Sequence, residues 1–227
     1  MASAFLSDLR RPWLWKGSGV GAALVLGFMA LMLVAAALEP RPSMEGFDEP
    51  LVEAGLTLTL TAAAVVGSFA FTSDYRTGCF IRRVLLFQRS PAFLGRAAST
   101  SLAALISGAV VGLIFVLSGK LLDESWHVSL TVVPAFAGLA AMGSVWGFAA
   151  GSLIRNHLVS LFGVPLSLLL PEMLVGPDTT FFPVLAADWA NQTAVNIPAW
   201  GSYLGAASWL LVVTALAFGV FLKRDLA

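Results

Sequence analysis

The chain has 227 residues, of which 58% are hydrophobic and only 11% are charged. In soluble domains, hydrophobic residues average about 45 to 50% and charged residues about 25%. Thirteen basic residues balance thirteen acidic ones, so no overall positive field favours DNA or RNA, and we expect no nucleic-acid partner. The single cysteine, Cys79, excludes an internal disulfide and a multi-cysteine metal site. This composition indicates an integral membrane protein.

Six apolar stretches approach or reach the roughly 20 residues that a helix needs to cross a bilayer. They cover residues 17–38, 55–71, 100–119, 131–154, 158–175 and 204–222. The sequence therefore predicts an all-α, polytopic membrane protein with six transmembrane helices in residues 17–227. Residues 1–16 precede the first stretch and form a separate N-terminal segment.

Basic residues are distributed unevenly among the connections between these stretches. Eleven lie on the side of the two chain ends, and only Arg41 and Lys120 lie on the other. The eleven are Arg10, Arg11, Lys16, Arg76, Arg82, Arg83, Arg89, Arg96, Arg155, Lys223 and Arg224. Because short cytoplasmic connections are enriched in Lys and Arg, we expect both termini to lie in the cytoplasm. The expected location is the plasma membrane, of a bacterial cell, with the chain crossing it several times.

The N-terminal segment has apolar residues at helical spacing. Phe5, Leu6, Leu9 and Trp13 alternate with polar positions, which suits a short helix lying in the inner headgroup layer. An ordinary cytoplasmic tail is the simpler alternative. We expect an interfacial helix within residues 1–16.

The connection after the second stretch has the strongest helical pattern of any loop. Ser73 or Asp74 is a candidate N-cap for a helix over residues 73–90 that ends before Pro91. Its apolar positions fall on one arc with arginines at both borders. The arc consists of Phe80, Ile81, Val84, Leu85 and Phe87, and the borders of Arg76, Arg82, Arg83 and Arg89. We favour a docking element over a loop that only satisfies topology.

Two further spans have patterned small or polar residues. Gly143, Gly147 and Gly151 recur every four residues, which allows close helix packing. Thr57, Thr61 and Ser68 share one stripe of the second span. Their hydroxyls either bond to carbonyls one turn back or line a weakly polar pathway, and the sequence leaves both open.

The region from the fifth span to the sixth is unusual. We expect Pro165 to break the fifth span and Pro171 to end it. Residues 171–203 are too apolar for a free loop and too interrupted to span, which predicts a re-entrant outer segment. Glu172 is then expected in the first turn of a short helix, as a functional acid or as a solvated one.

Catalytic motifs are missing from the sequence. The run Ser118-Gly119-Lys120-Leu121 lacks the first glycine and the hydroxyl of a phosphate-binding loop, so we expect no ATP hydrolysis by this chain. We likewise expect no metal site, since there is no H-E-x-x-H motif, and no serine nucleophile, since there is no G-x-S-x-G motif. An intramembrane enzyme and a non-transporting membrane scaffold or immunity protein remain alternatives to a transporter.

The run Asp74-Tyr75-Arg76-Thr77-Gly78 follows the second span and leads into the basic connection. Together with the interrupted fifth span and the basic-acidic tail, it resembles the permease subunits of type-2 ABC exporters. The resemblance implies a half-transporter that pairs with a second permease copy or paralogue, in contact with membrane lipid. A separate cytoplasmic ATP-binding-cassette subunit would bind the ATP and magnesium.

The same resemblance implies roles for individual residues. Residues 1–16 resemble the interfacial elbow helix, and the second and fifth spans would line a path for a hydrophobic or amphipathic cargo such as a drug, antibiotic, peptide or lipid. The implied ATPase contacts are Asp74, Tyr75, Arg76, Arg82, Arg83 and Arg89. The implied pathway residues are Thr57, Thr61, Ser68, Phe162, Leu166 and Leu169, and the outer gate comprises Glu172, Phe181 and Phe182.

Overall fold

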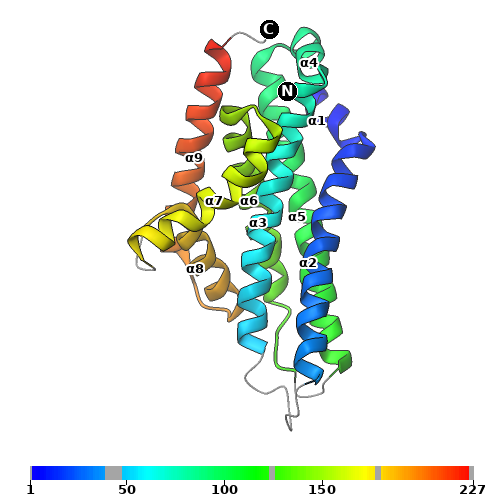
Figure 1. Cartoon of the computed structure of the whole chain (residues 1–227), viewed down its shortest axis with the longest axis vertical. Helices are drawn as coiled ribbons and strands as arrows, with labels where there is room; N and C mark the ends of the chain where they lie inside the picture. The colour runs from blue at the N-terminus through cyan, green and yellow to red at the C-terminus, as the bar shows by residue number, and fades with distance from the viewer. Residues whose placement is uncertain (1, 39–47, 123–125, 177–179, 225–227) are drawn as a thin grey trace.

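The computed structural model describes residues 2–38, 48–122, 126–176 and 180–224. Within these ranges the chain forms nine helices, six of them long and apolar enough to cross a membrane (Figure 1). The six are α2 (Pro12–Leu38), α3 (Asp48–Arg76), α5 (Arg89–Leu122), α6 (Val132–Ile154), α7 (His157–Val175) and α9 (Trp200–Lys223). The predicted fold class, an all-α polytopic membrane protein, is confirmed.

Three short helices complete the fold: α1 (Ala2–Leu9), α4 (Cys79–Phe87) and α8 (Phe182–Ala194). The first two lie at the end of the bundle that also carries both chain termini (Figure 1). We call this the terminal end, and the other the opposite end. Helix α8 packs between α6 and α9 and, with 13 residues, is too short to span a bilayer.

Several long helices extend beyond the predicted apolar stretches. Helix α5 has 34 residues and is therefore about 50 Å long, against about 30 Å of hydrocarbon. Its first turn contains Pro91, where a proline needs no N–H partner. The expectation that the preceding helix ends before Pro91 is confirmed, since α4 ends at Phe87. The polar residues that flank the apolar stretches continue the helices, because a helical backbone satisfies its own hydrogen bonds.

The core of the bundle is the pair α3 and α6, which has the most extensive contact of any two helices. The glycine stripe of α6 lies at this contact. A Cβ atom on Gly147 would come within 1.7 Å of the Ala64 carbonyl oxygen, and on Gly143 within 2.5 Å of the Leu60 carbonyl oxygen. Gly151 meets Ser68 in the same way, at 2.8 Å. The two backbones approach so closely because these positions have no side chain.

Helix α7 differs from its predicted form. It continues through Pro165 and Pro171 to Val175, so the expected break and early end are wrong. In Figure 1 its last turns, in yellow, lie across the bundle axis instead of along it. Prolines inside a helix remove backbone hydrogen bonds and produce such bends without ending the helix.

Candidate functional site

The basic connection forms a separate short helix, α4, bounded by two residues with positive φ. Gly78 has φ 70°, a conformation that glycine adopts without steric cost, and it separates α4 from the end of α3. Gln88 has φ 69°, and its N–H bonds to the Val84 carbonyl at 2.9 Å. Ser73 and Asp74 belong to the last turns of α3, so the predicted single helix over 73–90 is divided.

Helix α4 buries one face and exposes the other. Phe80 is fully buried and packs on Phe71 and Phe221, with ring centroids 4.9 and 5.3 Å apart. Leu85 and Leu86 are 81% and 76% exposed. The predicted apolar arc is thus wrong in part, because Ile81 and Leu85 lie on the exposed face while Phe80 lies inside. We call the exposed residues Arg76, Ile81, Arg82, Leu85 and Leu86 the docking face.

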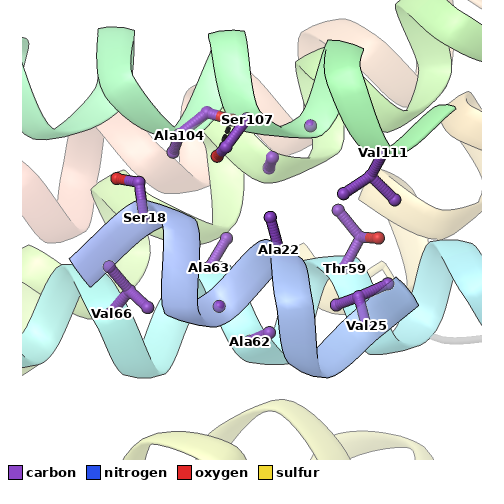
Figure 2. A pocket seen from close by; sticks show the side chains of 13 residues that line it. Ser18, Ala22, Val25, Thr59, Ala62, Ala63, Val66, Ala104, Ser107 and Val111 are labelled. Atoms are coloured by element: carbon purple, nitrogen blue, oxygen red, sulfur yellow. Dashed lines mark hydrogen bonds between the residues drawn. The ribbon is translucent and has the colours of Figure 1, made fainter. Parts of the chain in front are cut away.

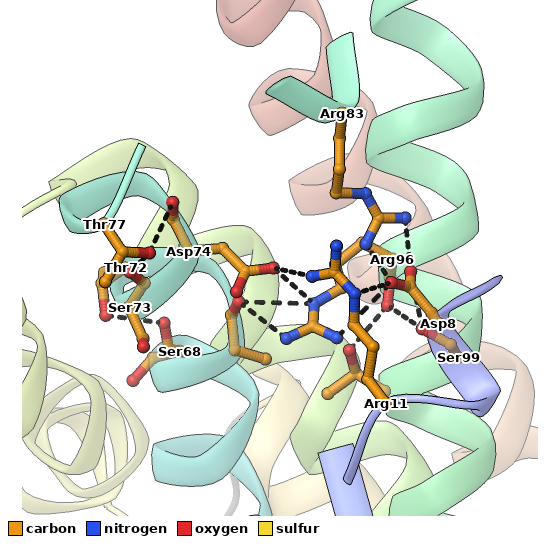
Figure 3. Close-up of polar contacts among 12 residues, drawn as sticks. Asp8, Arg11, Ser68, Thr72, Ser73, Asp74, Thr77, Arg83, Arg96 and Ser99 are labelled. Carbon is orange, nitrogen blue, oxygen red and sulfur yellow. Dashed lines mark hydrogen bonds and ion pairs between the residues drawn. The ribbon is translucent and has the colours of Figure 1, made fainter. Parts of the chain in front are cut away.

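Beneath α4, charged side chains from four parts of the chain meet at the terminal end (Figure 3). Arg83 donates from both terminal nitrogens to the two carboxylate oxygens of Asp8 on α1. Ser99 on α5 donates its hydroxyl to the same carboxylate at 3.3 Å. Arg83 is 2% exposed and Asp8 is fully buried, so this bidentate pair is shielded from water.

Arg96 on α5 continues the group of charges toward α3. Its Nε lies 3.2 Å from Asp74 Oδ2, and its Nη1 lies 3.8 Å from Asp8 Oδ1. It also donates to the Ala70 carbonyl oxygen at 3.4 Å. Arg11 lies 3.5 Å from Asp74 and 3.6 Å from Asp8. We call Asp8, Arg11, Asp74, Arg83 and Arg96 the terminal ionic cluster.

The terminal ionic cluster connects four helices that are far apart in sequence. Asp8 lies on α1, Asp74 at the end of α3, Arg83 on α4 and Arg96 near the start of α5. Removing one partner of a buried ion pair costs about 3 to 5 kcal/mol, because the remaining charge stays unpaired. A displacement of α4 therefore requires either loss of this pair or a matching displacement of α1.

The six expected ATPase contacts divide into internal and exposed residues. Arg83 lies inside the chain, so its expected role as a direct contact is corrected to a structural one. Asp74 belongs to the same cluster, and the Tyr75 hydroxyl accepts a hydrogen bond from Arg155 at 3.3 Å. Arg89 donates to the Leu222 carbonyl at 2.7 Å and so caps α9. Arg76 and Arg82 are exposed.

The expected pathway residues occupy two kinds of position. Thr57 is exposed, whereas the Thr61 and Ser68 hydroxyls donate to the Thr57 and Val65 carbonyls at 2.9 and 2.8 Å. Those two hydroxyls therefore make local helix bonds. The three α7 residues are exposed in the single chain. Their exposed fractions are 72% for Phe162, 50% for Leu166 and 45% for Leu169.

A small cavity lies between α2, α3, α5 and α6 (Figure 2). It is lined mainly by small residues such as Ser18, Ala22, Thr59 and Ser107, and its volume is about 20 Å³. That volume accommodates about one water molecule. This cavity is far too small for a drug, peptide or lipid.

The expected outer-gate residues lie at the end of α7 and around the start of α8. Glu172 is in the last turn of α7, where its carbonyl accepts from Gly176 N–H at 2.9 Å, so its expected place in a first turn is wrong. Phe182 is fully buried and stacks on Trp146 with centroids 4.7 Å apart. Phe181 is 38% exposed and contacts Trp209 at 5.5 Å.

Sequence reasoning missed Asp8, Arg11 and Arg96 as functional candidates. Asp8 is the one acid in an otherwise apolar and basic N-terminal segment, and Arg96 is a lone cation seven residues into a long apolar helix. Both are features that predict buried pairing. The described part of the chain contains no group of three or more His, Cys, Asp or Glu residues positioned to hold a metal ion.

No protein-family model matches this sequence, and no curated protein matches it either. The geometry of the terminal end and the local sequence pattern around it are therefore the observations that bear on function.

Proposed function

We propose that this chain is the membrane-spanning permease subunit of an ATP-driven exporter, and that a separate cytoplasmic ATP-binding subunit drives it. The observation that carries the proposal is the docking face. It is a mixed apolar and basic surface on a short helix whose other face is fixed to the bundle by Phe80 and Arg83. The run 74–78, with its resemblance to exporter permeases, lies directly beside it.

The docking face has the composition of a protein interface. Leu85 and Leu86 supply apolar area, while Arg76 and Arg82 supply exposed cations without a described ion-pair partner at the rim. Interfaces commonly combine an apolar centre with a polar rim, and rim charges select the partner and speed association. An acidic rim around an apolar pocket is the complementary surface expected on the ATP-binding subunit.

The terminal ionic cluster supplies the route by which movement of α4 would reach the membrane helices. A force on α4 acts through Arg83 on Asp8 of α1, and through Arg96 and Asp74 on α5 and α3. Closely packed elements with paired buried charges respond as rigid bodies. The permease thus needs no ATP chemistry of its own to change conformation.

The cargo path is proposed to lie between two permease copies, along the exposed faces of α3 and α7. The exposed position of Phe162, Leu166 and Leu169 supports this placement, as does the small volume of the cavity within one chain. An apolar wall favours a hydrophobic or amphipathic cargo over a sugar or nucleotide. The cell membrane, with both termini in the cytoplasm, is the expected location.

The decisive experiment first looks for an ATP-binding-cassette subunit encoded beside this chain, which the proposal expects, and then co-expresses the two chains for purification and ATPase assay in nanodiscs. The wild-type pair is expected to copurify and to hydrolyse ATP. The double variant Arg76→Glu with Arg82→Glu is expected to lose at least about tenfold in affinity for that subunit, as expected for two reversed rim charges.

Arg10→Glu is the matched control, because Arg10 is an exposed arginine of the terminal end outside α4. It is expected to leave copurification unchanged. Arg83→Glu is unsuitable as an interface probe, since it places a second acid against buried Asp8. The proposal fails if the folded Arg76→Glu/Arg82→Glu protein retains full affinity, or if the wild-type chain transports without any ATP-binding subunit.

A further inference from the structure

A hollow of about 320 Å³ opens between the end of α8 and the start of α9. Trp189, Thr193 and Asn196 line it from the α8 side, and Trp200 lines it from α9. Binding sites for small molecules are commonly about 300 to 1,000 Å³ in volume. The hollow is therefore large enough for a small head group and is unrelated to the terminal ionic cluster.

Two aromatic rings, Trp189 and Trp200, line this hollow, and the Tyr203 ring contacts both of them. The Tyr203 ring lies 5.8 Å from Trp189 at an interplanar angle of 53°, and 6.4 Å from Trp200 at 89°. Trp189 is held by Gly138 of α6, where a Cβ atom would come within 2.2 Å of the indole ring. Trp200 is 71% exposed, which leaves its ring accessible to a ligand. Tyr203 packs against both tryptophan rings and so helps to fix their positions at the hollow.

The charges around the hollow favour a cation. From residue 171 to residue 222 the sequence contains three acids and no Lys, Arg or His. One of the acids, Asp188, precedes Trp189 on α8 and is exposed. The C-terminal end of α8 adjoins the hollow, and a helix C-terminus carries a partial negative charge. An anionic head group would meet no compensating side chain here.

We propose that this hollow binds an alkylated ammonium head group, with Trp189 and Trp200 as the ring surfaces that contact it and Tyr203 as the ring that packs against both. Quaternary ammonium groups are recognised by aromatic rings at several angles, because the ring faces are negative and the methyl groups shed water readily. Thr193 and Asn196 supply neutral polar atoms at the edge. This inference stands whether or not the chain is an exporter.

The test compares choline with 3,3-dimethylbutan-1-ol, its neutral counterpart of the same shape. Each is titrated calorimetrically into the full-length protein in maltoside detergent, which has no charged head group. Choline is expected to bind at least about tenfold more tightly, as a cation–π contribution of one to two kcal/mol implies. Equal affinity for the two probes, or no binding of choline, overturns the proposal.

Variants locate the binding site. Trp200→Leu is expected to weaken choline binding by about tenfold, and Trp200→Phe by less, because a smaller aromatic face is retained. Trp13→Leu is the control, since Trp13 is 79% exposed and lies in the first turn of α2, far along the chain from the hollow. Circular dichroism verifies that each variant keeps its helices. Unchanged affinity in folded Trp200→Leu overturns the assignment of the site.

Two sources of the ammonium group are distinguished by the lipid around the protein. If the natural ligand is a lipid head group, choline binds more weakly in phosphatidylcholine nanodiscs than in phosphatidylethanolamine nanodiscs, which have the same net charge but no methyl groups on the ammonium, since the phosphatidylcholine competes. If it is a soluble organic cation, the affinities agree between the two kinds of nanodisc. Either result assigns the source, and binding in neither kind of nanodisc overturns the proposal.

Discussion

The two ends of this bundle differ in their ion pairs, although both pack aromatic rings. At the terminal end, Asp8 and Arg83 form a buried ion pair that joins α1 to α4, beside the packed rings of Phe71, Phe80 and Phe221. At the opposite end, the helices are joined by ring contacts such as Phe115 on Trp126, with centroids 5.4 Å apart, and by a hydrogen bond from the Thr131 hydroxyl to the Ala194 carbonyl at 2.5 Å. Charged pairs require defined partners, whereas ring contacts tolerate small displacements. The terminal end is therefore suited to transmitting movement, and the opposite end to adjusting around a ligand.

Asp8→Ala is expected to have the largest effect on stability. It leaves Arg83 buried without its carboxylate and removes one of the two acids near Arg96, so the free energy of unfolding should fall by about 3 to 5 kcal/mol. Unfolding in a titration with denaturing detergent, followed by circular dichroism, measures this change.

The double variant Asp8→Ala with Arg83→Met is the matched control for Asp8→Ala. Since it removes both charges, and methionine retains most of the arginine side-chain volume, it should recover most of the lost stability. If the double variant is as unstable as Asp8→Ala alone, the pair is not the contact that fixes α1 to α4, and the contrast between the ends is weakened.

Phe182→Ala tests the aromatic packing of α8 on α6 in the same assay. Phe182 is fully buried against Trp146, so the cavity left by the ring should lower the free energy of unfolding by about 3 kcal/mol. The neighbouring variant Phe181→Ala should cost clearly less, because Phe181 is 38% exposed. Equal losses of stability in the two variants would contradict the described difference in burial between Phe182 and Phe181.

Gly147→Ala perturbs the α3 and α6 contact that both ends share. The added methyl group meets the Ala64 backbone, and overpacking of this kind costs about 1 to 3 kcal/mol. Gly27→Ala on α2 is the control, since a Cβ atom there meets nothing within 4 Å, and it should raise stability slightly through helix propensity. If Gly147→Ala leaves the free energy of unfolding unchanged, α3 and α6 can separate easily, and the two ends of the bundle are not held to one rigid core.

The fold was largely predictable because bilayer thickness and backbone hydrogen bonding leave few alternatives for apolar stretches of this length. All six predicted stretches lie within helices long and apolar enough to span. The errors occurred where two local rules compete. Pro165 and Pro171 were expected to break and end the fifth span, but a helix packed among others tolerates proline with a bend.

The candidate site was less predictable. Helical periodicity placed Arg82 and Arg83 at the borders of one arc. In the structure Arg82 is exposed, whereas its neighbour Arg83 is buried. Which arginine is buried depends on the position of Asp8, which is 75 residues away in sequence. A pairing between distant charges leaves no periodic signal in a single sequence, so the terminal ionic cluster required the structure.

Leu85→Ser should have the smallest effect on stability and therefore isolates the docking face from the cluster beneath it. Leu85 is 81% exposed, and a substitution at such a position changes the free energy of unfolding by less than about 0.5 kcal/mol. The same substitution should weaken binding of the proposed ATP-binding subunit, because it removes apolar area from the centre of that face. Titration of labelled ATP-binding subunit onto the nanodisc-embedded chain measures this loss. A folded Leu85→Ser protein with unchanged affinity would assign the exposed leucines to the lipid surface, and the terminal end would then move α4 by contact with the membrane instead of with a partner.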